Sequence, residues 1–109
     1  MTNQELETIF KKLRDQTTRK QIKWKPINAT QLRIDFPRSS IIFNKPAGGQ
    51  PNLSILNSGG ASVAQIQYTS FGSHSGTLQE LGQMWKEAYE IAYETDETVQ
   101  DILSKLGNP

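Results

Sequence analysis

Cysteine is absent from the 109-residue chain. The protein therefore forms no disulfide bond, no thiolate metal site and no cysteine nucleophile, and such a composition is typical of a reducing compartment. No stretch approaches the roughly 20 consecutive apolar residues that a membrane-spanning helix needs. Residues 1–10 lack the basic region and apolar run of a signal peptide. We therefore expect a cytoplasmic protein that makes no contact with a membrane.

The sequence also lacks the glycine patterns that bind nucleotides. Its glycine pairs, residues 48–49 and 59–60, fit neither the phosphate-loop nor the dinucleotide-binding pattern. Both pairs stand among other turn-forming residues and are predicted to be turns. We expect no cofactor.

The composition is that of one small folded domain. Hydrophobic residues make up 35% of the chain and charged residues 21%, with a mean hydropathy of −0.59. Nine aromatic residues argue against disorder. A chain of this length can bury one modest core, so we predict a single domain over residues 1–109.

Charge is distributed unevenly along the chain, although the net charge is only +1. Residues 1–40 hold nine Lys and Arg against four Asp and Glu, residues 41–75 hold only Lys45, and residues 76–109 hold two Lys against seven acids. The order is therefore basic, nearly uncharged, then acidic, which favours contacts between the two ends or with charged partners.

Helices are predicted at both ends of the chain. Thr2 and Glu5 form a capping box before apolar residues at helical spacing, which predicts a helix over about residues 3–19. Thr77 and Glu80 form a second capping box before an apolar stripe that continues to residue 92. A third helix is predicted after residues 95–96. Its apolar positions are Val99, Ile102, Leu103 and Leu106.

Between the helices, short apolar segments alternate with polar residues, as in strands with one buried face. Ile22 and Trp24 begin this pattern, and further strands are expected over residues 32–36, 41–43, 53–56 and 63–68. Connections this short favour antiparallel neighbours. We predict an α+β fold with an N-terminal helix, a three- to four-stranded antiparallel meander, and two C-terminal helices packed on one sheet face.

Two segments give the chain a wider resemblance. The helix that ends in Ile22-Lys23-Trp24 before a meander, and the stretch from Leu81 to Leu106, are similar to those of a loose group of small uncharacterised bacterial proteins. The resemblance implies an N-terminal helix, a β-meander and a closing helix pair across nearly the whole chain. It implies no activity, ligand or functional residue.

Catalysis has little support in the sequence. His74 stands between Ser73 and Ser75, but adjacent residues seldom orient as nucleophile and base, and no acidic residue lies nearby to orient the imidazole. We favour a solvated loop histidine and keep an enzyme site near His74 as a remote alternative. The acids that share the face of residues 87, 90 and 94 are interpreted as a solvated helix face, so we expect no metal site and no enzyme.

The basic segment from Lys11 to Lys25 is a candidate nucleic-acid-binding site. Its cations would displace counterions from phosphates, and an exposed tryptophan would stack on a base. The residues concerned are Lys11, Lys12, Arg14, Arg19, Lys20, Lys23, Trp24 and Lys25. Two alternatives remain open. Trp24 belongs to the core, or the basic segment lies beside the acidic C-terminal helices of its own chain or meets those of a partner subunit. The pI of about 8.0 is lower than that of dedicated nucleic-acid binders.

Aromatic side chains recur at residues 85, 89 and 93, one helical turn apart. Trp85 is expected in the core, whereas Tyr89 and Tyr93 are candidate contacts for a protein partner, because tyrosine is enriched at interfaces. We therefore expect a non-enzymatic binding or accessory module whose partner is another protein or a second copy of this chain. Nucleic-acid binding is the alternative.

Overall fold

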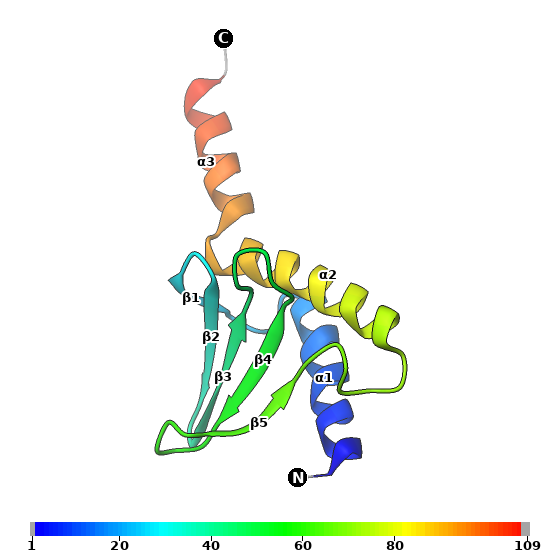
Figure 1. Cartoon of the computed structure of the whole chain (residues 1–109). Coiled ribbons are helices and arrows are strands. Elements are labelled where there is room, and N and C mark those ends of the chain that lie inside the picture. The colour runs from blue at the N-terminus through cyan, green and yellow to red at the C-terminus, as the bar shows by residue number, and fades with distance from the viewer. Residues whose placement is uncertain (1, 108–109) are drawn as a thin grey trace.

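A computed structural model describes residues 2–107 as a helix, five strands and two further helices (Figure 1). The elements are α1 (Asn3–Thr18), β1 (Lys25–Asn28), β2 (Gln31–Phe36), β3 (Ser39–Asn44), β4 (Asn52–Leu56), β5 (Ser62–Ile66), α2 (His74–Ala92) and α3 (Thr95–Leu106). The α+β class and the order of helices and strands are as predicted. The sheet, however, has five strands instead of three or four.

The additional strand is β1, which lies at the edge of the sheet. Ile22 and Trp24, predicted to alternate in a strand, are buried but precede β1 instead of belonging to it. All four residues of β1 are exposed, so no apolar alternation marks this strand in the sequence. It contains Pro26, a residue that sheets tolerate at their edges because no partner there needs its missing N–H.

The sheet is a simple meander with strand order β1-β2-β3-β4-β5, in which every neighbouring pair is antiparallel. Its register aligns apolar side chains in two rows across β2 to β5 on one face. The first row is Leu32, Phe43, Leu53 and Ile66, and the second is Ile34, Ile41, Ile55 and Ala64. Gly60, with φ of +85°, supplies the left-handed residue in the β4–β5 turn.

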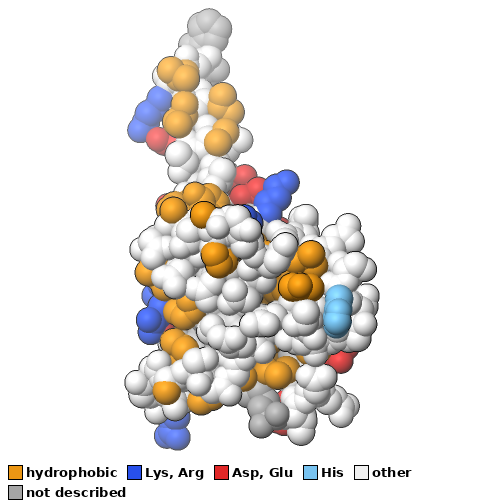
Figure 2. All heavy atoms as spheres, viewed as in Figure 1, with side chains coloured by type: hydrophobic (Ala, Val, Ile, Leu, Met, Phe, Trp, Pro, Cys, Tyr) orange, Lys and Arg blue, Asp and Glu red, His pale blue; other side chains and the backbone are white. Residues whose placement is uncertain are grey.

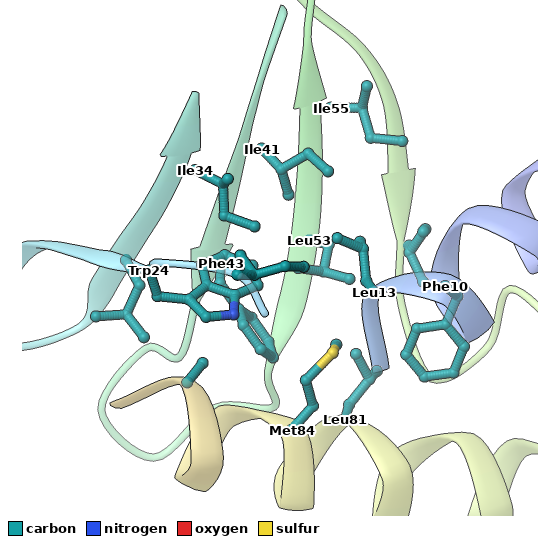
Figure 3. Close-up of a cluster of buried hydrophobic side chains, with 14 residues drawn as sticks. Phe10, Leu13, Trp24, Ile34, Ile41, Phe43, Leu53, Ile55, Leu81 and Met84 are labelled. Carbon is teal, nitrogen blue, oxygen red and sulfur yellow. The ribbon is translucent and has the colours of Figure 1, made fainter. Parts of the chain in front are cut away.

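Helices α1 and α2 cover this apolar face (Figures 1 and 3). The capping box of α1 is confirmed, since Glu5 N–H donates to Thr2 Oγ1 over 3.1 Å and Thr2 N–H donates to Glu5 Oε1 over 2.9 Å. Helix α2 begins at His74, three residues before the predicted start. Thr77 is therefore buried inside the first turns of the helix instead of capping it.

Trp24 ties the end of α1 to the centre of the core. Its indole ring is 2% exposed and lies 5.4 Å from the ring of Phe43, centroid to centroid (Figure 3). Its Nε1–H donates a 3.0 Å hydrogen bond to Oγ1 of Thr17, which is 1% exposed. The pair lets a buried indole satisfy its only polar group.

Helix α3 does not pack on the sheet, and the expectation that both C-terminal helices do so is wrong. No residue of α3 is buried, and the helix projects from the body of the molecule (Figure 1). The change of direction from α2 occurs at Glu94, whose φ of +50° is left-handed. The apolar positions predicted to pack in the core therefore remain on the surface.

Replacing Thr17 by valine should lower the free energy of unfolding by about 1–3 kcal/mol, because the buried indole N–H of Trp24 would lose its acceptor. Urea unfolding followed by tryptophan fluorescence measures this change. Thr18 is exposed on the next position of α1, so Thr18→Val is the matched control and should change stability by less than about 0.5 kcal/mol. Equal effects of the two substitutions would show that the hydrogen bond contributes nothing.

Candidate functional site

The basic segment is divided between intramolecular ion pairs and free cations. Four of its cations reach carboxylates within 4.0 Å: Lys11 pairs with Glu7, Arg14 with Glu80, Arg19 with Asp15, and Lys20 with Asp96. Two of these pairs link α1 and its C-terminal extension to the acidic helices α2 and α3. The remaining cations, Lys12, Lys23 and Lys25, are exposed and make no ion pair with another residue of 2–107.

Trp24 cannot stack on a nucleic-acid base, the role that its position in the basic segment suggested. A base could stack on the indole only if one face of the ring were open, and the ring is almost completely buried against Phe43. The expectation that Trp24 contacts nucleic acid is therefore corrected: the residue belongs to the core.

A groove of about 620 Å³ separates the basic segment from the C-terminal half of α2. One wall carries Lys20, Lys23 and Lys25. The opposite wall is acidic and consists of Glu87, Glu90, Glu94, Asp96 and Glu97. The lining also includes apolar residues, namely Ile22, Trp24, Pro26, Ile91 and Ala92. The groove thus brings together the basic and acidic ends of the chain that the sequence places far apart.

One ion pair crosses this groove. Lys20 Nζ lies 3.1 Å from Asp96 Oδ2, and the hydrogen bond and charge of Asp96 raise the pKa of Lys20 above its ordinary value. Both side chains are about two-thirds exposed, so solvent and salt screen the attraction and it contributes little to stability. The pair joins the segment after α1 to the first turn of α3.

His74 lies in the first turn of α2, not in a loop, and its side chain is exposed. The imidazole contacts the ring of Tyr68 edge-on, with centroids 6.3 Å apart. No carboxylate of residues 2–107 hydrogen-bonds to it, and the same residues contain no cluster of His, Asp and Glu that could hold a metal ion. Among residues 2–107, the fold therefore places no carboxylate where it would orient the imidazole of His74 for catalysis.

An aromatic column runs from the core to the surface along α2. Phe43 contacts Trp85 edge-on at 5.2 Å, Trp85 lies 6.1 Å from Tyr89, and Tyr89 lies 4.5 Å from Tyr93, centroid to centroid. Tyr89 and Tyr93 are each more than one-third exposed. The Tyr93 hydroxyl donates to the carbonyl oxygen of Asn28 over 3.2 Å, which brings the end of β1 to the tyrosines.

Most of the large apolar side chains that residues 2–107 expose lie on α3 and at its base. Ten large apolar side chains are exposed, and seven of them belong to this region. They are Ile27, Tyr89, Tyr93, Val99, Ile102, Leu103 and Leu106, which we name the α3 surface. Figure 2 shows hydrophobic side chains along α3 and again where the helix joins the body.

Sequence analysis identified only the two tyrosines of this surface. The apolar stripe of α3 looks the same in the sequence whether it packs inside the protein or outside it. Two signals could have found it: α1 and α2 already supply two apolar faces for one short sheet, and Ile27 stands beside Pro26 in a strand with no buried residue.

The uncovered face of the sheet carries a polar network, next to which Ile42 and Leu56 also lie. Gln31 donates to Asn44 over 2.8 Å, and Asn44 donates to Asn52 over 3.3 Å, which forms an amide ladder across β2, β3 and β4. Beside it, Arg33 Nε donates to Asp35 Oδ1 over 2.6 Å, and Ser40 Oγ donates to the same oxygen over 2.9 Å.

These hydrogen bonds hold the pKa of Asp35 below its ordinary value of 3.8, Arg33 contributing most and Ser40 next. A depressed pKa stabilises the fold at pH values above the unfolded pKa, and the stabilisation is lost as the pH falls through the folded pKa. In a carboxyl-detected NMR titration, Ser40→Ala should raise the midpoint of Asp35 and Ser39→Ala should not. A midpoint of Asp35 at its ordinary value in the unmodified chain would contradict the network.

No helix among residues 2–107 is both long enough and apolar enough to cross a membrane. No protein-family model matches the chain, and neither a curated protein nor a solved structure matches it. What the protein does is therefore inferred from its own residues.

Proposed function

We propose that this chain is a non-enzymatic protein-binding module that contacts another polypeptide through the α3 surface. The observation that carries the proposal is that α3 has no buried residue although it presents Val99, Ile102, Leu103 and Leu106 on one face. Contiguous exposed apolar surface of this kind marks sites of contact with other proteins.

The length of α3 supports the same conclusion. Isolated helices shorter than about 12–15 residues are marginal in water, because most helical stability comes from packing of an apolar face. Helix α3 has 12 residues, and its N-cap residue Glu94 makes no side-chain capping bond. Packing against a partner would supply the stabilisation that the body of the protein does not.

The tyrosines extend the contact surface from α3 to the body. Tyr89 and Tyr93 present amphipathic rings beside the base of α3, and such rings combine apolar area with a hydroxyl that tolerates water. Because the column behind them reaches Phe43, they rest on a rigid support. A rigid aromatic anchor loses little conformational entropy when a partner binds.

Photo-crosslinking tests this function without assuming which protein binds. A photoreactive phenylalanine derivative at Leu103 should form a discrete covalent adduct with a polypeptide in cells that contain the chain. The same derivative at Ser104, on the opposite face of α3, is the matched control and should not. The protein in the adduct should bind the purified chain, and Leu103→Asp should weaken that binding at least about tenfold because it places a charge in an apolar contact.

Absence of an adduct at Leu103, or equal adducts at Leu103 and Ser104, would contradict the proposal. The tryptophan fluorescence of Trp24 and Trp85 reports whether each variant keeps its core, because both rings pack against the buried ring of Phe43.

Nucleic-acid binding is the second candidate, and the observation in its favour is that Lys12, Lys23 and Lys25 are exposed without an ion-pair partner in the described chain. Three cations without a stacking ring supply only a weak, salt-sensitive attraction to phosphates. Fluorescence anisotropy with labelled single- and double-stranded DNA and RNA should therefore show no binding at physiological salt. Micromolar binding there, abolished by Lys23→Glu, would make this the leading function.

A further inference from the structure

We infer that the junction between α2 and α3 is a hinge with two states: the bent state in which α3 projects from the body, and a straight state in which residues 74–106 form one helix. The inference goes beyond the proposed function, because it concerns the free chain and needs no partner. It is carried by the phase of the apolar side chains across the junction, by the left-handed backbone of Glu94, and by the small number of contacts that hold α3 in place.

The apolar positions of α3 repeat those of α2 at a constant spacing. They follow the α2 positions by 18 residues, which is five complete turns of a helix with 3.6 residues per turn. The pairs are Leu81 and Val99, Met84 and Ile102, Trp85 and Leu103, and Ala88 and Leu106. In one continuous helix, the stripe of α2 that packs in the core would therefore continue along the same face to the end of α3. Two independent helices joined by a bend do not need to agree in phase.

The charged side chains follow the same continuous pattern. On an ideal helix, seven of the eight charged residues between positions 81 and 106 fall within an arc of about 100° opposite the apolar stripe. They are Lys86, Glu87, Glu90, Glu94, Glu97, Asp101 and Lys105. Residues 83–106 contain neither glycine nor proline, so no helix-breaking residue marks the junction. The sequence therefore has the pattern of one amphipathic helix where the structure has two.

The bend is made at a residue whose side chain disfavours it. Glu94 has φ of +50° and ψ of +44°, in the left-handed region that glycine adopts readily. For a residue with a side chain, this conformation lowers the population by a factor of about 5–30. Ordinary helical angles at Glu94 would remove that penalty and let the backbone hydrogen bonds of α2 continue into α3.

Few contacts oppose the straight state. No residue of α3 is buried, so core packing does not fix the direction of the helix. Among residues 2–107, the only side-chain hydrogen bond between α3 and another part of the chain joins Lys20 Nζ to Asp96 Oδ2, over 3.1 Å. Straightening moves Asp96 relative to Lys20, so the ion pair favours the bent state. Because both side chains are about two-thirds exposed, salt weakens the pair.

The two states present the same apolar side chains in different directions. In the bent state, the four apolar residues of α3 lie on a helix that leaves α2 at a steep angle (Figure 1). In the straight state, they would extend the core-facing stripe of α2 beyond Tyr93, whose hydroxyl bonds to the edge strand β1. The hinge therefore determines which surface the chain offers to other molecules.

Pulsed electron paramagnetic resonance of the full chain measures both states. The natural chain has no cysteine, so Gln83→Cys and Ser104→Cys introduce the only sites for thiol-reactive spin labels, at exposed positions of α2 and α3. In a continuous helix, positions 83 and 104 are separated by about 32 Å, whereas a bend makes the separation shorter. Both distances should be present, and the longer one should gain population as the salt concentration rises.

Two substitutions should shift the balance in opposite directions. Lys20→Gln removes the ion pair and should raise the ratio of straight to bent chains about 1.5- to 5-fold. Glu94→Gly removes the penalty of the left-handed backbone and lowers helix propensity, so it should reduce the ratio at least about fivefold. Lys23→Gln is the control for the first substitution, because Lys23 is exposed and makes no ion pair within residues 2–107. Glu94→Ala is the control for the second, because alanine keeps the left-handed penalty. Neither control should reduce the ratio, and Lys23→Gln should leave it unchanged.

A single distance that neither salt nor any variant changes overturns the inference, whether that distance belongs to the bent or to the straight chain. Equal responses to Lys20→Gln and Lys23→Gln overturn the role of the ion pair. These outcomes are distinguishable from failure of the proposed function, because the distances are measured without a partner and do not depend on whether a polypeptide crosslinks at Leu103.

Discussion

The arrangement of the whole molecule depends on a sheet that has one continuous apolar face. The register of β2 to β5 collects Leu32, Phe43, Leu53 and their neighbours on that face, whereas hydrogen-bonded polar side chains occupy much of the other. Two helices cover a five-stranded sheet of this length, and α1 and α2 already do so. The third amphipathic helix, α3, lies outside this packing and buries none of its residues.

The core and the exposed surface are connected by one run of aromatic rings. Trp24 contacts Phe43, Phe43 contacts Trp85, and the contacts continue through Tyr89 to Tyr93 at the base of α3. The fully buried ring of Phe43 and the exposed ring of Tyr93 therefore belong to the same packed column. A partner that binds at Tyr89 and Tyr93 would therefore contact side chains that are packed against the core, not side chains of a loop.

Local patterns predicted what is determined locally. The capping box at Thr2 and the apolar alternation of residues 32–36 gave α1 and β2, because these signals act within a few residues. Strand β1 was missed because its residues are all exposed and show no alternation of apolar and polar side chains. Thr77 was mistaken for a helix cap because its spacing to Glu80 matches a capping box, although its side chain is buried within the helix. The position of α3 and the burial of Trp24 depend on how many helices one sheet face accommodates, which no short window of sequence records.

The left-handed backbone at Glu94 sets the direction of α3 at a small cost in energy. A left-handed backbone at a residue other than glycine costs only about 1–2 kcal/mol, so few contacts at the base of α3 are needed to hold the bend. With ordinary helical angles at residues 93 and 94, α2 and α3 would join into a single rod of about 50 Å. The backbone conformation of Glu94 thus sets the angle between α2 and α3, and with it the direction in which the molecule presents the apolar side chains of α3.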